Sequence, residues 1–185
     1  MQDYHSFIGE VLIEEEQLKK RVKELGEDIS RDYHGKEILA ICILRGGVMF
    51  LTDLIRHITP LVAIDFMGVS SYGAGTRSSQ GQVRITLDLT TSIAGKHVLI
   101  VEDIIDSGNT LASVIEMLQT RHPASLEVCT LLNKASRREV DIPIKYCGFI
   151  IPDKFVFGYG LDMDEFYRNL PFIGVVDLEK YEAGL

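Results

Sequence analysis

The stretch "VLIVEDIIDSGNT", residues Val98 to Thr110, combines the features that decide the fold. It opens with four apolar residues in a row, a run typical of a strand that is covered on both faces. Carboxylates follow at Glu102, Asp103 and Asp106, and a Ser-Gly-Asn-Thr turn leads into a helical pattern. This order predicts a buried strand, an acidic strand end and a turn at the start of a helix, which is the repeating unit of an α/β fold.

Similar patterns flank this stretch on both sides. Continuous apolar runs predict further core strands, one alternating segment predicts an antiparallel partner strand, and apolar residues at helical spacing predict helices. We therefore expect a mostly parallel central sheet flanked by helices. The predicted strands are 37–44, 61–69, 82–89 (antiparallel), 97–101 and 126–132, and the predicted helices are Val11 to about Tyr33, 47–58 and 110 to about 121.

After about Pro143 the pattern loosens into short segments. We interpret it as a last core strand followed by a small subdomain, the hood, which the N-terminal residues help to complete. The length of 185 residues fits one domain. We expect residues 1–185 to form that single domain, with a core of about 35–150 and a hood from about 1–12 and 151–185.

Composition narrows the functional class. The chain has 46% hydrophobic and 25% charged residues, as in ordinary soluble globular proteins. Its net charge of -8 argues against nucleic acid as the main partner. Cys42, Cys129 and Cys147 are odd in number and widely spaced, so we expect buried, reduced thiols. We see no signal peptide and no run that would cross a membrane, and we expect a cytoplasmic protein.

The residues that follow the parallel strands should form the binding site. Ligands of such sheets bind beyond the carboxyl ends of the strands. The segments in that position are "RGG" after Leu44, "EDIIDSGNT" after Val101 and "NKASRR" after Leu132. We expect these polar or glycine-rich loops to gather on one face.

The turn Ser107–Thr110 has the composition of a phosphate cradle. A helix N-terminus offers unpaired N–H groups and a positive dipole end, and Gly108 permits a tight turn. The same residues are also ordinary helix caps, so the turn alone does not decide between the two interpretations. The adjacent acids favour the site: carboxylates about 6 Å apart repel by roughly 3 kcal/mol, and ribose hydroxyls or Mg²⁺ would relieve that repulsion.

At this point the chain resembles a known family. "VLIVEDIIDSGNT" is similar to the phosphoribosyl-pyrophosphate motif of type I phosphoribosyltransferases, and the rest resembles their hypoxanthine-guanine branch over nearly the whole length. "ILRGG" (43–47) matches the pyrophosphate loop, "SSYG" (70–73) the start of a mobile lid and "LLNKASRR" (131–138) the purine-recognition segment. "IPDKFVFGYGLDMDEFYRNLPFIG" (151–174) matches the purine-stacking and metal-binding tail.

The resemblance implies a role for each matching residue. Asp106 would be the general base or proton relay near the purine N7. The residues that would bind the phosphoribosyl group are Glu102, Asp103, Asp106, Ser107, Gly108, Asn109 and Thr110. Pyrophosphate would be bound by Arg45, Gly46 and Arg168, and the purine by Lys134, Phe155, Val156 and Asp162. The residues that would bind Mg²⁺ are Glu102, Asp103 and Asp162.

Other implications concern the loops. Within the lid Ser70–Gln82, Ser71 and Tyr72 would touch pyrophosphate. The family often has lysine where this chain has Arg45, and a non-proline cis peptide bond between Leu44 and that residue. Without the resemblance, Lys134 is equally well a surface lysine, and "DMDEFYR" is simply a polar helix start.

The implied reaction transfers a phosphoribosyl group from 5-phosphoribosyl 1-pyrophosphate to N9 of a 6-oxopurine, hypoxanthine and also guanine. We expect no nucleic-acid or membrane partner and a homodimer or homotetramer. One alternative is a regulator that keeps the fold and binds nucleic acid; another is a close relative that prefers guanine or xanthine. A phospho-receiver domain fits poorly, because the first core strand ends in Arg-Gly-Gly rather than in acids.

Overall fold

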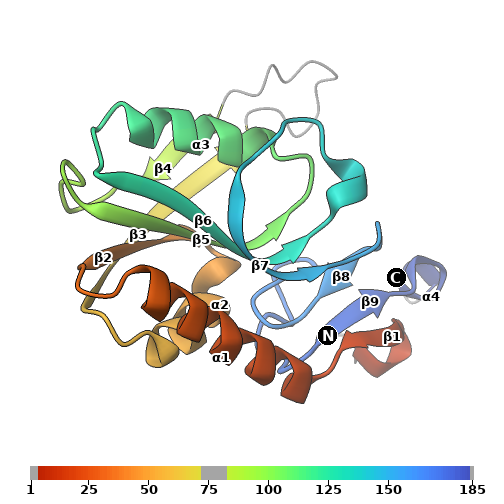
Figure 1. Cartoon of the computed structure of the whole chain (residues 1–185). Coiled ribbons are helices and arrows are strands. Elements are labelled where there is room, and N and C mark those ends of the chain that lie inside the picture. Colours follow the sequence, from red (N-terminus) through yellow and green to blue (C-terminus); the bar gives the residue numbers. More distant parts are fainter. Residues whose placement is uncertain (1–3, 72–82, 184–185) are drawn as a thin grey trace.

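The computed structural model describes residues 4–71 and 83–183 (Figure 1). Its main element is a six-stranded sheet with the order β4-β3-β2-β5-β6-β7. Every neighbouring pair is parallel except β3 and β4, as expected for this fold class. The strands are β2 Ile38–Leu44, β3 Val62–Ser71, β4 Val83–Leu87, β5 His97–Ile105, β6 Ser125–Asn133 and β7 Ile144–Ile150.

Helices cover both faces of this sheet (Figure 1). α1 (Glu15–Asp32) and α2 (Gly47–Leu54) lie on one face, and α3 (Asn109–Gln119) lies on the other. Successive strand residues point to opposite faces, so β2 contributes to two clusters. Ala40 and Cys42 join the cluster of α1 and α2, whereas Ile41 joins the cluster of α3. The continuous apolar runs of the sequence thus reflect burial on both faces.

Strand β5 extends further than expected. The sequence predicts its end at Val101, but the strand continues to Ile105 because β6 runs on beside it. Glu102 pairs with Thr130, and Ile104 pairs with Leu132. Glu102 and Asp103 therefore lie within the last residues of a paired strand, whereas Asp106 follows its end.

The N-terminal segment corrects one prediction. Residues 11–13 were expected in a helix, but they belong to strand β1 (Ile8–Ile13), and α1 begins only at Glu15. The start of α1 is fixed by a capping box, in which Glu14 and Gln17 exchange side-chain to backbone hydrogen bonds. Apolar residues 11–13 suit either element, and pairing with the C-terminal strand decides between them.

The small sheet has the order β1-β9-β8, with β8 Val156–Phe157 and β9 Ile173–Val176. It joins the N-terminal strand to the last strand of the chain, as the sequence suggested for the hood. A separate cluster of Phe7, Phe157, Met163 and Val176 forms its core.

The remaining helical elements are short, and one predicted helix ends early. α2 ends at Leu54, and residues 55–57 form a 3₁₀ turn rather than helix up to Ile58. Over residues 4–71 and 83–183, the helices are all too short or too polar to cross a bilayer. The other short elements are η1 Tyr4–Ser6, η2 Ile55–His57, η3 Ala135–Arg137 and α4 Leu178–Ala183.

Candidate active site

The loops after β2, β5 and β6 meet at one edge of the sheet, as the fold rule predicted. The Lys134 N–H donates to the Ile105 carbonyl at 3.0 Å, which joins the loop after β6 to the end of β5. A Cβ on Gly46 would lie 1.5 Å from Asp103 Oδ2, so Asp103 rests directly against the loop after β2. Only glycine fits at position 46.

The β5–α3 turn forms a small concave site. Gly108 has φ +91°, a conformation that favours glycine, and α3 begins at the next residue. Ser107 Oγ accepts from the Asn109 Nδ2 amide at 3.3 Å. A pocket of about 140 Å³ is lined by Glu102, Ile104, Ile105, Asp106, Ser107, Gly108, Thr110 and Leu111.

The segment after β6 supports this turn from outside. The backbone N–H groups of Glu139 and Val140 both donate to the Ser107 carbonyl, at 2.9 and 3.3 Å. The Glu139 carboxylate also accepts from Asn109 Nδ2 at 2.6 Å. These contacts hold the turn in place without using the backbone N–H groups at the start of α3.

Glu102 and Asp103 form an acidic pair in which Glu102 is buried and Asp103 is half-buried. Burial raises the pKa of Glu102 well above its usual range, and the neighbouring Asp103 raises it further. Burial also raises the pKa of Asp103, although the Ile104 N–H and the positive charge of Arg168 partly offset this effect. Both carboxyl groups are thus short of compensating positive charge, which a cation would provide.

A divalent cation fits this pair in part. Hard cations prefer carboxylate oxygens, and Mg²⁺ is commonly held by one or two carboxylates together with substrate oxygens. Within the described residues, no three His, Cys, Asp or Glu side chains are close enough to hold a metal by themselves. The structure therefore does not gather Glu102, Asp103 and Asp162 into one site; it offers a two-carboxylate pair and a separate Asp162.

Asp106 lies within a group of charged side chains. Arg137 Nε is 3.0 Å from Asp106 Oδ1, and Lys134 Nζ is 4.0 Å from Asp106 Oδ2. Asp153 completes the group, 3.7 Å from Lys134 and 3.4 Å from Arg137. Lys134 follows β6 and is only 8% exposed. It is therefore not a surface lysine, which was the alternative interpretation of the sequence.

Two of the expected purine residues, Phe155 and Val156, closely follow Asp153 of this group along the chain. Phe155 is 49% exposed and available for stacking, whereas Val156 and Phe157 are buried in β8. Phe157 packs on Phe7 with ring centroids 5.5 Å apart, so it is a core residue. Asp162 is half-buried, and its Oδ2 accepts from the Glu165 N–H at 2.9 Å.

The expected pyrophosphate residues also come together. The peptide bond between Leu44 and Arg45 is cis, as the resemblance implied. Arg168 donates to the Gly160 carbonyl at 2.9 Å and lies 3.0 Å from Asp162 Oδ1. Arg45 and Arg168 both contact Glu165, at 2.6 and 3.1 Å.

Part of the expected lid is not described. Tyr72 and the following residues up to Gln82 lie outside the described residues, and of Ser71 only the backbone position in β3 is defined. The expected pyrophosphate contacts of Ser71 and Tyr72 stay predictions.

Residues that the sequence analysis missed include Arg137 and Glu165. Arg137 stands in the quoted segment "NKASRR", and Glu165 stands in "DMDEFYR", so both were near predicted residues. Their charge alone carried no signal, because exposed charged residues are common. Arg137 comes close to Asp106, and Glu165 to Arg45, only when the chain folds, so the sequence does not reveal these contacts.

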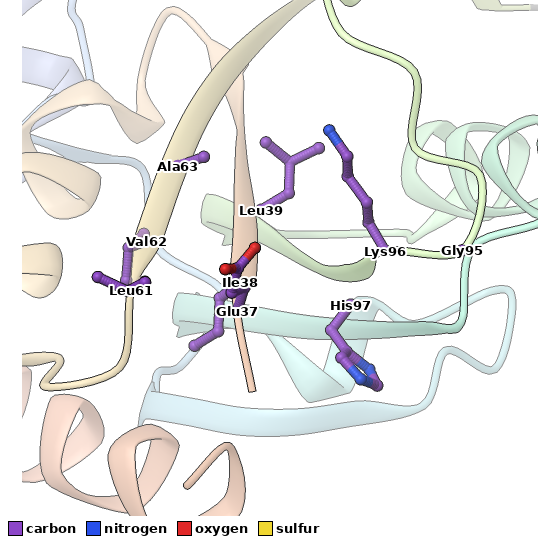
Figure 2. A pocket seen from close by; sticks show the side chains of 9 residues that line it. All are labelled: Glu37, Ile38, Leu39, Leu61, Val62, Ala63, Gly95, Lys96 and His97. Carbon is purple, nitrogen blue, oxygen red and sulfur yellow. The ribbon is translucent and has the colours of Figure 1, made fainter. Parts of the chain in front are cut away.

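A larger pocket, of about 400 Å³, lies at the opposite end of the sheet (Figure 2). It is formed where β2, β3 and β5 begin, and its lining is mostly apolar. The side chains of Lys96 and His97 extend in opposite directions, so its polar groups do not converge on one point (Figure 2). The smaller pocket at the β5–α3 turn has the chemistry of a site, and the larger one does not.

Comparisons with known proteins show the family of this chain. Residues 12–165 match the phosphoribosyl transferase domain family. The chain is 51% identical over 177 residues to the hypoxanthine-guanine phosphoribosyltransferase of Staphylococcus aureus, covering 96% of this chain and 98% of that protein.

Solved structures give the same result. The crystal structure of a hypoxanthine phosphoribosyltransferase from Staphylococcus aureus superposes with a TM-score of 0.92 at 50% identity, covering 96% of each chain. A hypoxanthine-guanine phosphoribosyltransferase from Bacillus anthracis gives a TM-score of 0.88 at 50% identity, covering 91% of this chain and 99% of that one.

Proposed function

The chain belongs to the phosphoribosyl transferase domain family, and from this membership we propose that it is a purine salvage enzyme, a hypoxanthine-guanine phosphoribosyltransferase. It transfers the phosphoribosyl group of 5-phosphoribosyl 1-pyrophosphate to N9 of hypoxanthine, and of guanine, and releases pyrophosphate. The observation that carries this proposal is the 51% identity along 96% of the chain, together with the site at the β5–α3 turn. We propose the residue roles below on the same basis.

The donor binds at the β5–α3 turn. The 5-phosphate lies against Ser107–Thr110, where the start of α3 presents backbone N–H groups and a positive dipole end. Gly108 allows close approach of the backbone, and Asn109 and Thr110 add side-chain donors. The ribose hydroxyls donate to Glu102 and Asp103, whose buried carboxylates need partners.

Pyrophosphate leaves at the opposite side of the ribose. Arg45 and Arg168 stabilise its negative charge, and the Gly46 backbone contacts it. Glu102 and Asp103, and at a second position Asp162, would hold Mg²⁺, which would supply further positive charge to the leaving group when bound. The family uses a divalent metal, and Mg²⁺ is the ion that suits a small set of carboxylates with phosphate oxygens.

The purine binds between the hood and the loop after β6. Phe155 stacks on the ring, and the Val156 backbone and Asp162 face its edge. Lys134 donates to O6, a contact that adenine lacks because its amino group offers no acceptor at that position. Asp106 accepts or relays the proton at N7, within reach of both Lys134 and Arg137.

The remaining predictions stay proposals. We propose a single domain of residues 1–185, with a core of about 35–150 and a hood from about 1–12 and 151–185. A homodimer or homotetramer and a cytoplasmic location are proposed as well, the latter supported by the free thiols of Cys42, Cys129 and Cys147. Cys147 is half-buried rather than buried. The nucleic-acid regulator is not favoured, given the relatives and the net charge of -8.

A turnover assay tests the function. The protein is incubated with 5-phosphoribosyl 1-pyrophosphate, with and without Mg²⁺, and with hypoxanthine, guanine, xanthine or adenine in turn. We expect Mg²⁺-dependent formation of nucleotide from hypoxanthine and guanine, and little from adenine. A folded sample that turns over none of the four bases would refute the proposal, and efficient use of adenine would remove Lys134 from its role.

A further inference from the structure

Glu165 makes an unusual contact. Its Oε2 atom accepts from Arg45 Nη1 at 2.6 Å and from Arg168 Nη2 at 3.1 Å. Arg45 follows β2, whereas Arg168 belongs to the segment between β8 and β9. One carboxylate oxygen therefore joins guanidinium groups that are 123 positions apart in the chain.

These arginines are the groups assigned to pyrophosphate, so their other contacts matter. Arg168 is anchored through Nη1, which donates to the Gly160 carbonyl at 2.9 Å. Its Nη2 is shared between Glu165 and Asp162 Oδ1, the latter at 3.0 Å. Arg45 is less enclosed, because 70% of its side chain is exposed.

Glu165 imitates the chemistry of a phosphate oxygen. Guanidinium groups bind carboxylate and phosphate oxygens with the same charge-assisted hydrogen bonds. An incoming pyrophosphate that uses Arg45 and Arg168 must therefore displace the Glu165 oxygen. The Glu165 side chain is 59% exposed, and the Glu165 backbone N–H donates to Asp162. The side chain can therefore swing away while the loop stays in place.

We propose that Glu165 is an internal competitor of pyrophosphate for Arg45 and Arg168, and that it lowers the affinity of this end of the site. The inference rests on the proposed function. Its functional consequence is faster release of pyrophosphate after transfer. Because exposed ion pairs are weak, the effect on affinity is modest, roughly threefold to tenfold.

Calorimetric titration with sodium pyrophosphate, without added metal, tests this role directly. Glu165→Gln keeps the shape of the side chain and removes its charge. We expect it to bind pyrophosphate roughly threefold to tenfold more tightly than the unaltered protein. In turnover assays the same variant should show a correspondingly lower inhibition constant for pyrophosphate, while affinity for inosine monophosphate stays unchanged.

Asp164→Asn is the matched control. Asp164 is the adjacent acid and also has a positive φ, but its carboxylate contacts Tyr181 rather than the arginines. We expect less than a twofold change in pyrophosphate affinity for this variant. If both variants gain pyrophosphate affinity equally, the cause is the loss of one negative charge rather than the contact with the arginines, and the proposal is overturned.

Other outcomes are equally decisive. If Glu165→Gln binds pyrophosphate equally well or more weakly, Glu165 organises the arginines or is indifferent, and the competitor role is wrong. This failure is separate from failure of the proposed function. In the latter case the unaltered protein would neither bind pyrophosphate nor turn over any purine base.

Discussion

The ends of the candidate site are built by different means. The phosphate end, at Ser107–Thr110, consists of backbone and short side chains from one continuous stretch. The proposed pyrophosphate end consists of charged side chains from two segments, Arg45 after β2 and Asp162, Glu165 and Arg168 between β8 and β9, which neutralise one another. The phosphate end is fixed by main-chain geometry. At the pyrophosphate end, a ligand has to replace existing ion pairs with its own contacts.

This difference has consequences for how each end responds to change. A rigid backbone cradle should be sensitive to shape and insensitive to salt. Exposed ion pairs should respond to charge and to ionic strength, because mobile ions screen them. The variants below are arranged by the size of the effect that this comparison predicts.

Asp106, which lines the pocket at the β5–α3 turn, should matter most for turnover. Asp106→Asn removes the proton acceptor but keeps the side-chain shape. We expect kcat to fall by about 100-fold or more, the usual contribution of a general base. Binding of 5-phosphoribosyl 1-pyrophosphate, measured by calorimetry, should change by less than about threefold. Unchanged turnover would remove Asp106 from the catalytic role.

Gly108→Ala should damage the phosphate end by shape alone. The residue has φ +91°, and a Cβ would lie 2.9 Å from Ile142 Cδ1 and 3.1 Å from the Val140 carbonyl. Strain of about 1–3 kcal/mol should raise KM for the donor roughly 10- to 100-fold, with little dependence on salt. Gly35→Ala is the control: Gly35 has φ +75°, and nothing lies within 4 Å of its Cβ position. If both variants raise KM equally, local crowding is not the cause.

Arg168→Gln should damage the pyrophosphate end by charge. Loss of a charged hydrogen-bond donor lowers kcat/KM for the donor substrate by about tenfold. Steady-state kinetics at about 0.05 and 0.5 M salt provide the test, because screening should shrink the difference from the unaltered protein. A deficit that is independent of salt would mean that Arg168 acts mainly through its hydrogen bond to Gly160.

Glu102→Gln should change stability rather than binding geometry. Because burial raises the pKa of Glu102, the folded protein binds this proton more tightly than the unfolded chain. The group therefore destabilises the fold as pH rises through that raised pKa. In chelator at pH 8 we expect the variant to be more stable by about 1 kcal/mol, or roughly 3 °C in Tm, and the gain should vanish at acid pH. Thermal scans that show no gain at pH 8 would contradict this explanation.

The strand, the acids and the turn around the proposed phosphate end could be predicted from the sequence because their information is local. The buried residues Val98–Val101, the acids and the turn follow one another along the chain, so one motif specifies them together. The parallel sheet then followed from the repeated apolar runs. The extension of β5 to Ile105 was missed because it depends on the neighbouring strand β6, which the local pattern does not encode.

The pyrophosphate end was predicted only through the family resemblance. Its residues are ordinary charged side chains in segments that meet by folding. Arg45 was assigned, but its contact with Glu165 lies across 120 positions and has no local signal. For the same reason residues 11–13 were placed in a helix, because their strand partner lies far away in β9, where Val11 pairs with Gly174, 163 positions along the chain.

The pairing of β1 with β9 also sets an order of events during synthesis on the ribosome. The strands of the large sheet are complete once Ile150 has been added, whereas the small sheet needs residues up to Val176. Its N-terminal strand, made first, must wait for the last strand before it has a partner. Phe155, Asp162 and Arg168 lie in this late-forming part. A chain that stops short of β9 lacks the strand that lies between β1 and β8, so the segment carrying these residues has no small sheet to hold it.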